Sequence, residues 1–238
     1  MNQQSSVSHP GRYRWLAFVF TGILILDQFF VLFELQEARY VSKSLLMPTL
    51  MAYFWLSAGS TPAMARRLIL TALFFSWLGD VLLLLELHNS IFFILGLSAF
   101  LIAHIFYIIY FEKWRREAGA PFRPIILLPV LAWYAILMFI LTPSLGDLLI
   151  PVWIYGAVIC LMLALAWQVQ AGLRTRATLL AATGASYFVV SDSVLAVNKF
   201  YTAIPLAGII VMFTYALAQM FIVTGALLRH LQPDERNR

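Results

Sequence analysis

Two aspartates in otherwise apolar segments are the residues best suited to do chemistry in this sequence. Asp80 lies in FSWLGDVLLLLEL, residues 75–87, and Asp192 lies in GASYFVVSDSVLAVNKF, residues 184–200. An ionisable group at membrane depth costs about 2.5 to 3.5 kcal/mol on insertion scales, so it usually faces a partner or a polar cavity. Buried carboxyl groups can take up and release protons, and we expect these two to line such a cavity.

Polar and basic side chains accompany both acids. Ser76 precedes Asp80 by four residues and shares its helical face, while Lys199 follows Asp192 by seven residues on the same face. Lys43 begins another apolar segment. A single buried acid could serve only to fix helix packing through hydrogen bonds. Two acids with two lysines favour a polar cavity.

The composition indicates a membrane protein. Of the 238 residues, 62% are hydrophobic and only 11% are charged, which is too little charge for the surface of a water-soluble domain. Apolar runs of roughly bilayer-spanning length predict an all-α, polytopic membrane helix bundle. Its eight transmembrane helices are expected over residues 15–33, 42–57, 68–87, 91–111, 125–141, 150–168, 177–197 and 204–228.

One transmembrane domain, residues 15–228, accounts for nearly the whole chain. We expect a short cytoplasmic N-terminal tail, residues 1–14, and a cytoplasmic C-terminal tail, residues 229–238. No small-residue cleavage site follows the first apolar run, so this run is predicted to remain as a helix and not to be removed as a signal peptide.

The basic residues predict the orientation. Of the 16 Lys and Arg residues, 13 fall in the tails or in alternate loops: Arg12, Arg14, Arg66, Arg67, Lys113, Arg115, Arg116, Arg123, Arg174, Arg176, Arg229, Arg236 and Arg238. The positive-inside rule places these segments, and both termini, in the cytoplasm. Asp80 then lies about 10 Å below the outer end of its helix, and Asp192 lies at a similar level. Basic clusters between apolar runs reflect membrane orientation, so the net charge of +5 predicts no nucleic-acid partner.

Two further spans contribute polar side chains to the expected cavity. His104 and Tyr107 share a face of the fourth span, and Tyr215 and Gln219 are four residues apart in the eighth. A lone histidine is as often a hydrogen-bonded core residue as a ligand, and the spans supply no second histidine for a zinc site. The sequence contains neither a G-x-S-x-G elbow nor a Gly-rich phosphate loop. We expect no metal and no cofactor.

Several segments resemble the motifs of the YhhN-like family, which includes lysoplasmalogenases. They are SWLGDVLLL at 76–84, GLSAFLIAHIFY at 96–107, VVSDSVLAVNKF at 189–200, residues 215–219, and Lys43 with Met47 and Pro48, although Ser44 stands where the family pattern has proline. The resemblance covers nearly the whole chain. It implies an integral multi-pass protein of a bacterial inner (cytoplasmic) membrane. Characterised members cleave the vinyl ether of lysoplasmalogen to a fatty aldehyde and a glycerophospho-base.

The chemistry implied by this resemblance suits two buried carboxyl groups. A vinyl ether is hydrolysed after a proton is added to its β-carbon, and water then captures the oxocarbenium ion. Glycosidases divide the acid and base roles between two carboxyl groups in a similar way. We therefore expect Asp80 and Asp192 to be the catalytic acid and base, in either order. The expected substrate-binding residues are Lys43 and Lys199, for the lysophospholipid phosphate, and His104, Tyr107, Tyr215 and Gln219, for water or an aspartate.

Two other functional classes stay open at this point. Intramembrane acids in equivalent helices of a repeated bundle are also typical of proton-coupled transporters and flippases. A structural or regulatory membrane protein would use the acids for packing alone. Besides the bilayer and the lysophospholipid, the sequence predicts no partner and no oligomeric state.

Overall fold

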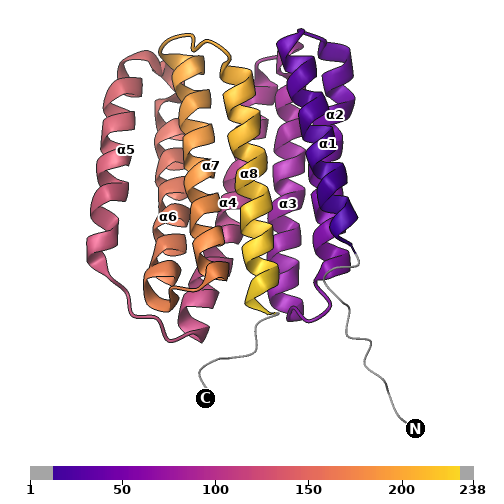
Figure 1. Ribbon diagram of the computed structural model, residues 1–238. Coiled ribbons are helices and arrows are strands. Elements are labelled where there is room, and N and C mark those ends of the chain that lie inside the picture. The colour runs from indigo at the N-terminus through magenta and orange to yellow at the C-terminus, as the bar shows by residue number, and fades with distance from the viewer. Residues whose placement is uncertain (1–12, 231–238) are drawn as a thin grey trace.

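The protein is a bundle of helices packed side by side. The computed structural model describes residues 13–230, and no strand occurs among them. Eight α-helices run along this part of the chain (Figure 1): α1 (Arg14–Leu32), α2 (Gln36–Ser57), α3 (Ala63–Leu84), α4 (Ile91–Glu117), α5 (Leu127–Leu141), α6 (Leu149–Leu173), α7 (Arg176–Phe200) and α8 (Ala207–Arg229). The all-α prediction is confirmed. Arg12, Arg236, Arg238 and most of the two predicted tails lie outside the described residues.

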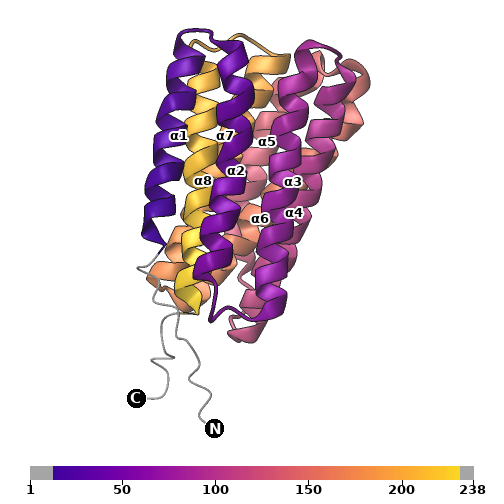
Figure 2. The same cartoon turned by 90° about the vertical axis from the view of Figure 1, so that its right-hand side faces the viewer.

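Seven of the helices in residues 13–230 are long and apolar enough to cross a bilayer. The exception is α2, whose N-terminal half carries Glu37, Arg39 and Lys43. This helix nevertheless lies within the bundle, beside α1 and α3 (Figure 2). The chain is an integral membrane protein, and the count of eight spans stays a prediction.

The helix boundaries depart from the predicted ones mainly at charged turns. α2 begins at Gln36, six residues before the predicted apolar run, because a search for apolar residues does not count its charged first turns. α4 continues past Phe111 to Glu117, where Arg115 and Arg116 in the last turn face the negative end of the helix dipole. α8 begins only at Ala207 because the preceding residue adopts a left-handed conformation.

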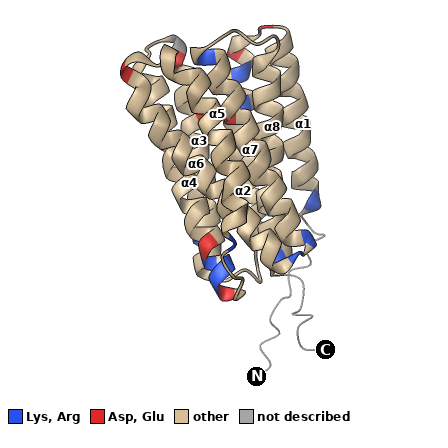
Figure 3. Cartoon of the chain, turned by 90° about the vertical axis from the view of Figure 1, so that its left-hand side faces the viewer, with Lys and Arg blue, Asp and Glu red and all other residues tan. Residues whose placement is uncertain are grey.

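Charged residues gather toward the two ends of the bundle and leave its middle nearly uncharged (Figure 3). α1 begins and α8 ends at the same end (Figure 1). At that end Glu117 pairs with Lys113 at 2.6 Å and with Arg229 at 2.5 Å. At the other end, which we call the outer end, Lys199 of α7 pairs with Glu86 after α3. The outer ends of α3 and α7, the two helices that carry the predicted acids, are therefore neighbours.

The most extensive contact between described helices joins α7 and α8, and small residues take part in it. A Cβ atom added at Gly184 would lie 2.7 Å from the carbonyl oxygen of Ala218, and one added at Gly225 would lie 2.7 Å from that of Ala177. Small residues let helix backbones approach in membranes, where dispersion and polar contacts drive packing. The approach brings α8 against the helix that carries Asp192.

We predict that Gly225→Ala destabilises the protein, because the new methyl group meets backbone atoms of α7 that cannot move aside cheaply. Overpacking of this kind costs about 1 to 3 kcal/mol, so the melting temperature in detergent should fall by several degrees. The matched control is Gly22→Ala in α1, where an added Cβ has nothing within 4 Å. Equal melting temperatures for the two variants would contradict this account of the α7 and α8 contact.

Candidate functional site

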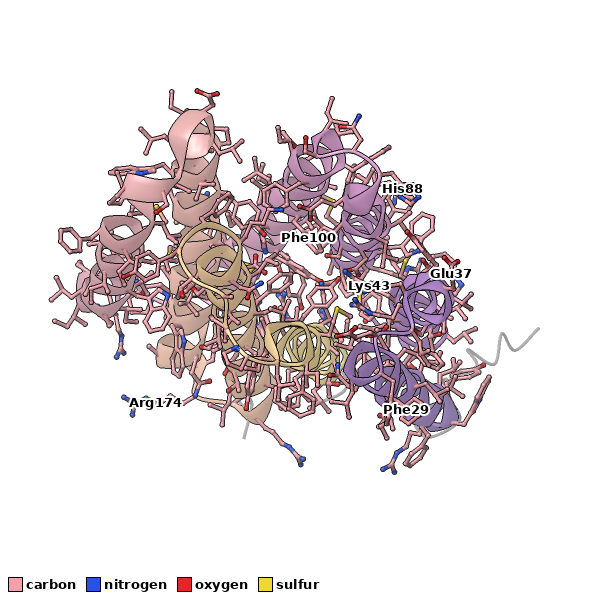
Figure 4. All side chains as sticks on the ribbon, turned by 90° about the horizontal axis from the view of Figure 1, so that it is seen from above. Phe29, Glu37, Lys43, His88, Phe100 and Arg174 are labelled. Atoms are coloured by element: carbon pink, nitrogen blue, oxygen red, sulfur yellow. The ribbon has the colours of Figure 1, made fainter. Side chains whose placement is uncertain are left out.

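Asp80 is held at the centre of three helices. Its Oδ2 accepts a 2.8 Å hydrogen bond from the Tyr215 hydroxyl of α8, and its Oδ1 lies 3.7 Å from Nζ of Lys43 on α2. Asp80 is 2% exposed and Lys43 is 8% exposed. Seen from above, Lys43 and Phe100 lie toward the middle of the bundle, whereas Arg174 lies at its edge (Figure 4). Asp80 therefore has a buried cation and a phenol as partners.

A ladder of uncharged polar groups continues from this pair toward the middle of the bundle. Gln219 of α8 donates from Nε2 to Ser76 Oγ at 2.9 Å and accepts from the Tyr107 hydroxyl at 2.5 Å. All three side chains are buried. These hydrogen bonds join α3, α4 and α8, and on α3 they lie one helical turn away from Asp80. Tyr107, Tyr215 and Gln219 are thus brought together with Asp80, as expected for members of one polar site.

A second buried acid, Asp27 of α1, extends the charged cluster. Its Oδ1 accepts a 2.7 Å hydrogen bond from Ser42 and lies 3.9 Å from Nε of Arg39. Asp27 is fully buried and, with Arg39, lies close enough to Lys43 to interact electrostatically with it. Sequence reasoning did not assign Arg39 or Ser42 to the site. For Arg39 the sequence did contain an indication, because Arg39 and Lys43 are four residues apart and share a helical face.

Asp192 has a different environment. Its Oδ2 accepts a hydrogen bond from the Tyr155 hydroxyl of α6, and none of the ion pairs among the described residues involves it. Sequence reasoning also missed Tyr155, whose hydroxyl is an isolated polar group within an apolar span. Asp192 therefore has a neutral donor where Asp80 has a cation.

A narrow, mostly apolar cavity lies beside Asp192. Its volume is about 60 Å³, and it is enclosed chiefly by α4, α5, α6 and α7. Asp192, Tyr155 and Ser193 are among its few polar lining residues. The aliphatic and aromatic lining includes Leu97, Phe100, Trp133, Leu137, Met138, Val152, Val189 and Phe200. The cavity thus presents one carboxyl group to an apolar space, which suits a substrate with a hydrocarbon part.

Aromatic rings separate the two acids. Phe188 contacts Tyr215, the partner of Asp80, at 5.4 Å between ring centroids, and it contacts His104 at 4.6 Å. His104 in turn lies 5.4 Å from the ring of Tyr155, the partner of Asp192. The two acids that were expected to act as a pair are therefore connected through a series of ring contacts, and a layer of rings lies between them.

His104 itself makes no hydrogen bond within the described part of the chain, although its side chain is fully buried. The expected role in orienting an aspartate has no counterpart in its contacts, which are to aromatic rings. An unpartnered buried imidazole costs free energy, so a water molecule with polar neighbours would suit this position.

Lys199 lies beside the cavity, next to its lining residues Phe93 and Phe200. It pairs with Glu86, and its Nζ lies 5.1 Å from the centroid of Phe93, a cavity-lining ring. Its side chain is 42% exposed. Lys199 is therefore accessible from the outer end, whereas Lys43 is buried against Asp80.

Comparison with known proteins identifies the family. The YhhN family matches residues 38–226. Lysoplasmalogenase TMEM86B of Homo sapiens is 30% identical over 230 residues, which cover 93% of this chain and 90% of the relative. Lysoplasmalogenase TMEM86A of Homo sapiens is 29% identical over 168 residues, 67% of this chain and 65% of the relative.

A bacterial relative is similar as well. A lysoplasmalogenase of Mycobacterium tuberculosis is 32% identical over 174 residues, which cover 71% of this chain and 64% of the relative. No solved structure matches this chain. The family match spans both acid-bearing segments, and the resemblance of the sequence motifs is confirmed: the chain belongs to the YhhN family.

Proposed function

We propose that this protein is a lysoplasmalogenase, a membrane hydrolase that cleaves the vinyl ether bond of a lysophospholipid. The observation that carries the proposal is the contrast between the surroundings of Asp80, which is buried, and those of Asp192, which is partly buried. Asp80 is paired with Lys43, whereas Asp192 faces an apolar cavity with Tyr155 as its only hydrogen-bond partner in the described chain. The names of the YhhN relatives support the substrate class.

In the proposed reaction Asp192 acts as the acid. An apolar environment favours the neutral form of a carboxyl group, so Asp192 can keep a proton to give. Its O–H proton is transferred to the β-carbon of the vinyl ether, whose π electrons form the new C–H bond and leave an oxocarbenium ion. Water attacks the α-carbon and loses a proton to the Asp192 carboxylate. The resulting hemiacetal breaks down to a fatty aldehyde and the free hydroxyl of the glycerophospho-base, with one water consumed.

Asp80 supplies the negative charge that stabilises this cation. Its pairing with Lys43 and Tyr215 favours the carboxylate form, and its field acts across a layer of rings with low dielectric response. Phe100 lies directly against Gly79, the neighbour of Asp80, where an added Cβ would be 2.6 Å from the ring. Phe100 therefore keeps the substrate chain away from the charged cluster. We propose that Tyr107, Gln219 and His104 orient the attacking water.

Lys199 is proposed to bind the phosphate of the head group. It is accessible beside the cavity, and its partner Glu86 can face the positively charged amine of a zwitterionic head group. Lys43, which sequence reasoning also assigned to the phosphate, is buried against Asp80, and we propose that it serves this carboxylate instead.

The proposed topology has eight spans, with both termini in the cytoplasm and residues 15–228 as the transmembrane domain. The charges of α2 are paired inside the bundle, which supports α2 as the eighth span. The cluster of basic residues at the end where α1 begins and α8 ends supports the cytoplasmic assignment. We also propose the inner membrane of a bacterial cell as the location, which the similarity to a mycobacterial relative supports.

We predict that Asp192→Asn lowers the rate of aldehyde release from lysoplasmalogen by about 10²- to 10⁴-fold, because the amide has no acidic proton to give.

Asp80→Asn should also inactivate the protein, but it leaves Lys43 buried without a counter-charge and can unfold the protein. The double variant Lys43→Met/Asp80→Asn removes both charges and should be folded and inactive. The assay uses detergent-purified protein, with melting temperature as the measure of folding.

The outcomes of this assay separate the functional classes. Full activity of a folded Asp192→Asn variant would contradict the proposed acid. A wild-type protein that releases no aldehyde in detergent, where no second compartment exists, would instead favour transport. A change in stability alone would indicate a packing role for the acids.

We predict that Tyr155→Phe lowers kcat by about 10- to 100-fold, because the Asp192 carboxylate formed after proton transfer loses its donor, and a hydrogen bond to a charged group contributes about 1.5 to 3 kcal/mol. Tyr134→Phe is the matched control, since Tyr134 lines the same cavity but donates to the carbonyl oxygen of Trp153 at 3.1 Å. Equal kcat values for the two variants would remove Tyr155 from the mechanism.

Lys199→Met should raise KM by about two- to fivefold with little change in kcat, because a half-exposed charge contributes about 0.2 to 1 kcal/mol to binding. A lower kcat at unchanged KM would show that Lys199 acts in the chemical step and not in head-group binding. Lys113→Met at the opposite end of the bundle is the control for loss of a partly exposed lysine.

A further inference from the structure

A second hollow lies beside the cavity of Asp192, between α5, α6 and α7. We call it the tail groove, and it is lined by Ile125, Ile126, Pro129, Val130, Trp133, Leu163, Trp167, Gln170, Ala171, Arg174, Ser186, Val189 and Val190. Its volume of about 780 Å³ compares with about 60 Å³ for the cavity of Asp192. Pockets for ligands of moderate size usually have about 300 to 1,000 Å³. The cavity can hold the reacting bond, but the rest of a lipid chain needs a space such as the tail groove.

The two hollows share part of their walls. Trp133 of α5 and Val189 of α7 line both. The indole N–H of Trp133 donates to Ser193 Oγ at 3.2 Å, and Ser193 follows Asp192 in the chain. The tail groove therefore begins at the wall of the cavity that contains the acid.

The length of the tail groove suits a single fatty chain. Along α6 it extends from Leu163 to Ala171, which corresponds to about 12 Å at 1.5 Å per residue, and Arg174 lines it just beyond the helix. The hydrocarbon core of a bilayer is about 30 Å thick, so one leaflet's chain occupies about half of it.

Most of the tail groove is apolar to a ligand, because its polar groups within the helices are largely bonded to protein and the charged residue Arg174 lies only beyond the end of α6. Trp167 donates to Ser186 Oγ at 3.1 Å, and Gln170 accepts from Thr178. α5 contacts α6 and only slightly α7, so its packing leaves the groove accessible from the lipid side. These features fit a hydrocarbon chain and not a polar ligand.

We propose that the tail groove holds the alkenyl chain of the lysophospholipid substrate, with Trp133 at the point where the chain leaves the cavity of Asp192. The inference rests on the proposed function and deepens it, because it makes the groove residues farthest from Trp133 determinants of chain length. Ala171, near the end of α6, is one of them.

Ala171→Phe tests the proposal, because the ring would fill the far end of the tail groove without touching the cavity. With purified protein and lysoplasmalogens of increasing chain length, this variant should lose about tenfold in kcat/KM for long chains and keep wild-type values for short ones. The matched control is Ala135→Phe, a substitution at an exposed position of α5 outside both hollows. An unchanged chain-length profile for Ala171→Phe would overturn the proposal.

A binding measurement tests the tail groove without catalysis. A saturated ether lysophospholipid with a photoreactive diazirine near the end of its chain should label the groove walls of α5, α6 and α7, and Ala171→Phe but not Ala135→Phe should reduce the labelling. Labelling spread over other lipid-facing helices such as α1, or equal in both variants, would overturn the proposal. Groove labelling in a protein that releases no aldehyde would overturn the proposed reaction and leave the groove as a lysolipid site.

Discussion

The pairing of Asp80 with Lys43 is the constraint on which the rest of the bundle depends. A charge buried in a membrane is costly, and removing one member of a buried pair typically costs about 3 to 5 kcal/mol. The pair is satisfied only when α2, α3 and α8 meet at one level, because the remaining lone pairs of Asp80 need Tyr215. Asp27 with Ser42 then brings in α1 at the same level. One half of the bundle is therefore organised around charges.

The other half of the bundle is organised around an apolar cavity. Asp192 lies on α7, and α7 is fixed against α8 by glycines whose replacement would bring side-chain atoms within 2.7 Å of backbone oxygens. α8 also carries Tyr215 and Gln219, which bond to the charged half. The α7 and α8 contact thus sets the distance between the two acids, although neither acid bonds to the other's partners.

The sequence predicted the helices well, because apolar length is a property of single segments. It also predicted that Tyr215, Gln219 and Tyr107 join Asp80, since their spacing marks inward faces of helices. Tyr155 and the ring layer were not predictable in this way. Which side chains meet across a bundle depends on helix rotation and neighbour order, and an apolar span offers many faces of similar hydrophobicity. For the same reason the burial of Lys43 against Asp80 could not be distinguished from exposure to a phosphate.

The separation of the acids suits a reaction whose intermediate is an oxocarbenium ion formed on a lipid substrate. A carboxyl group that must donate a proton benefits from apolar surroundings, whereas a carboxylate that must stay charged needs a cation and hydrogen bonds. One shared pocket could not supply both environments. Phe100, Phe188 and His104 keep the two environments apart. The buried imidazole of His104, which makes no hydrogen bond within the described residues, is the polar member of this layer. In the proposed mechanism, water would reach the oxocarbenium ion past this ring from the polar half, while the lipid chain would lie on the opposite side.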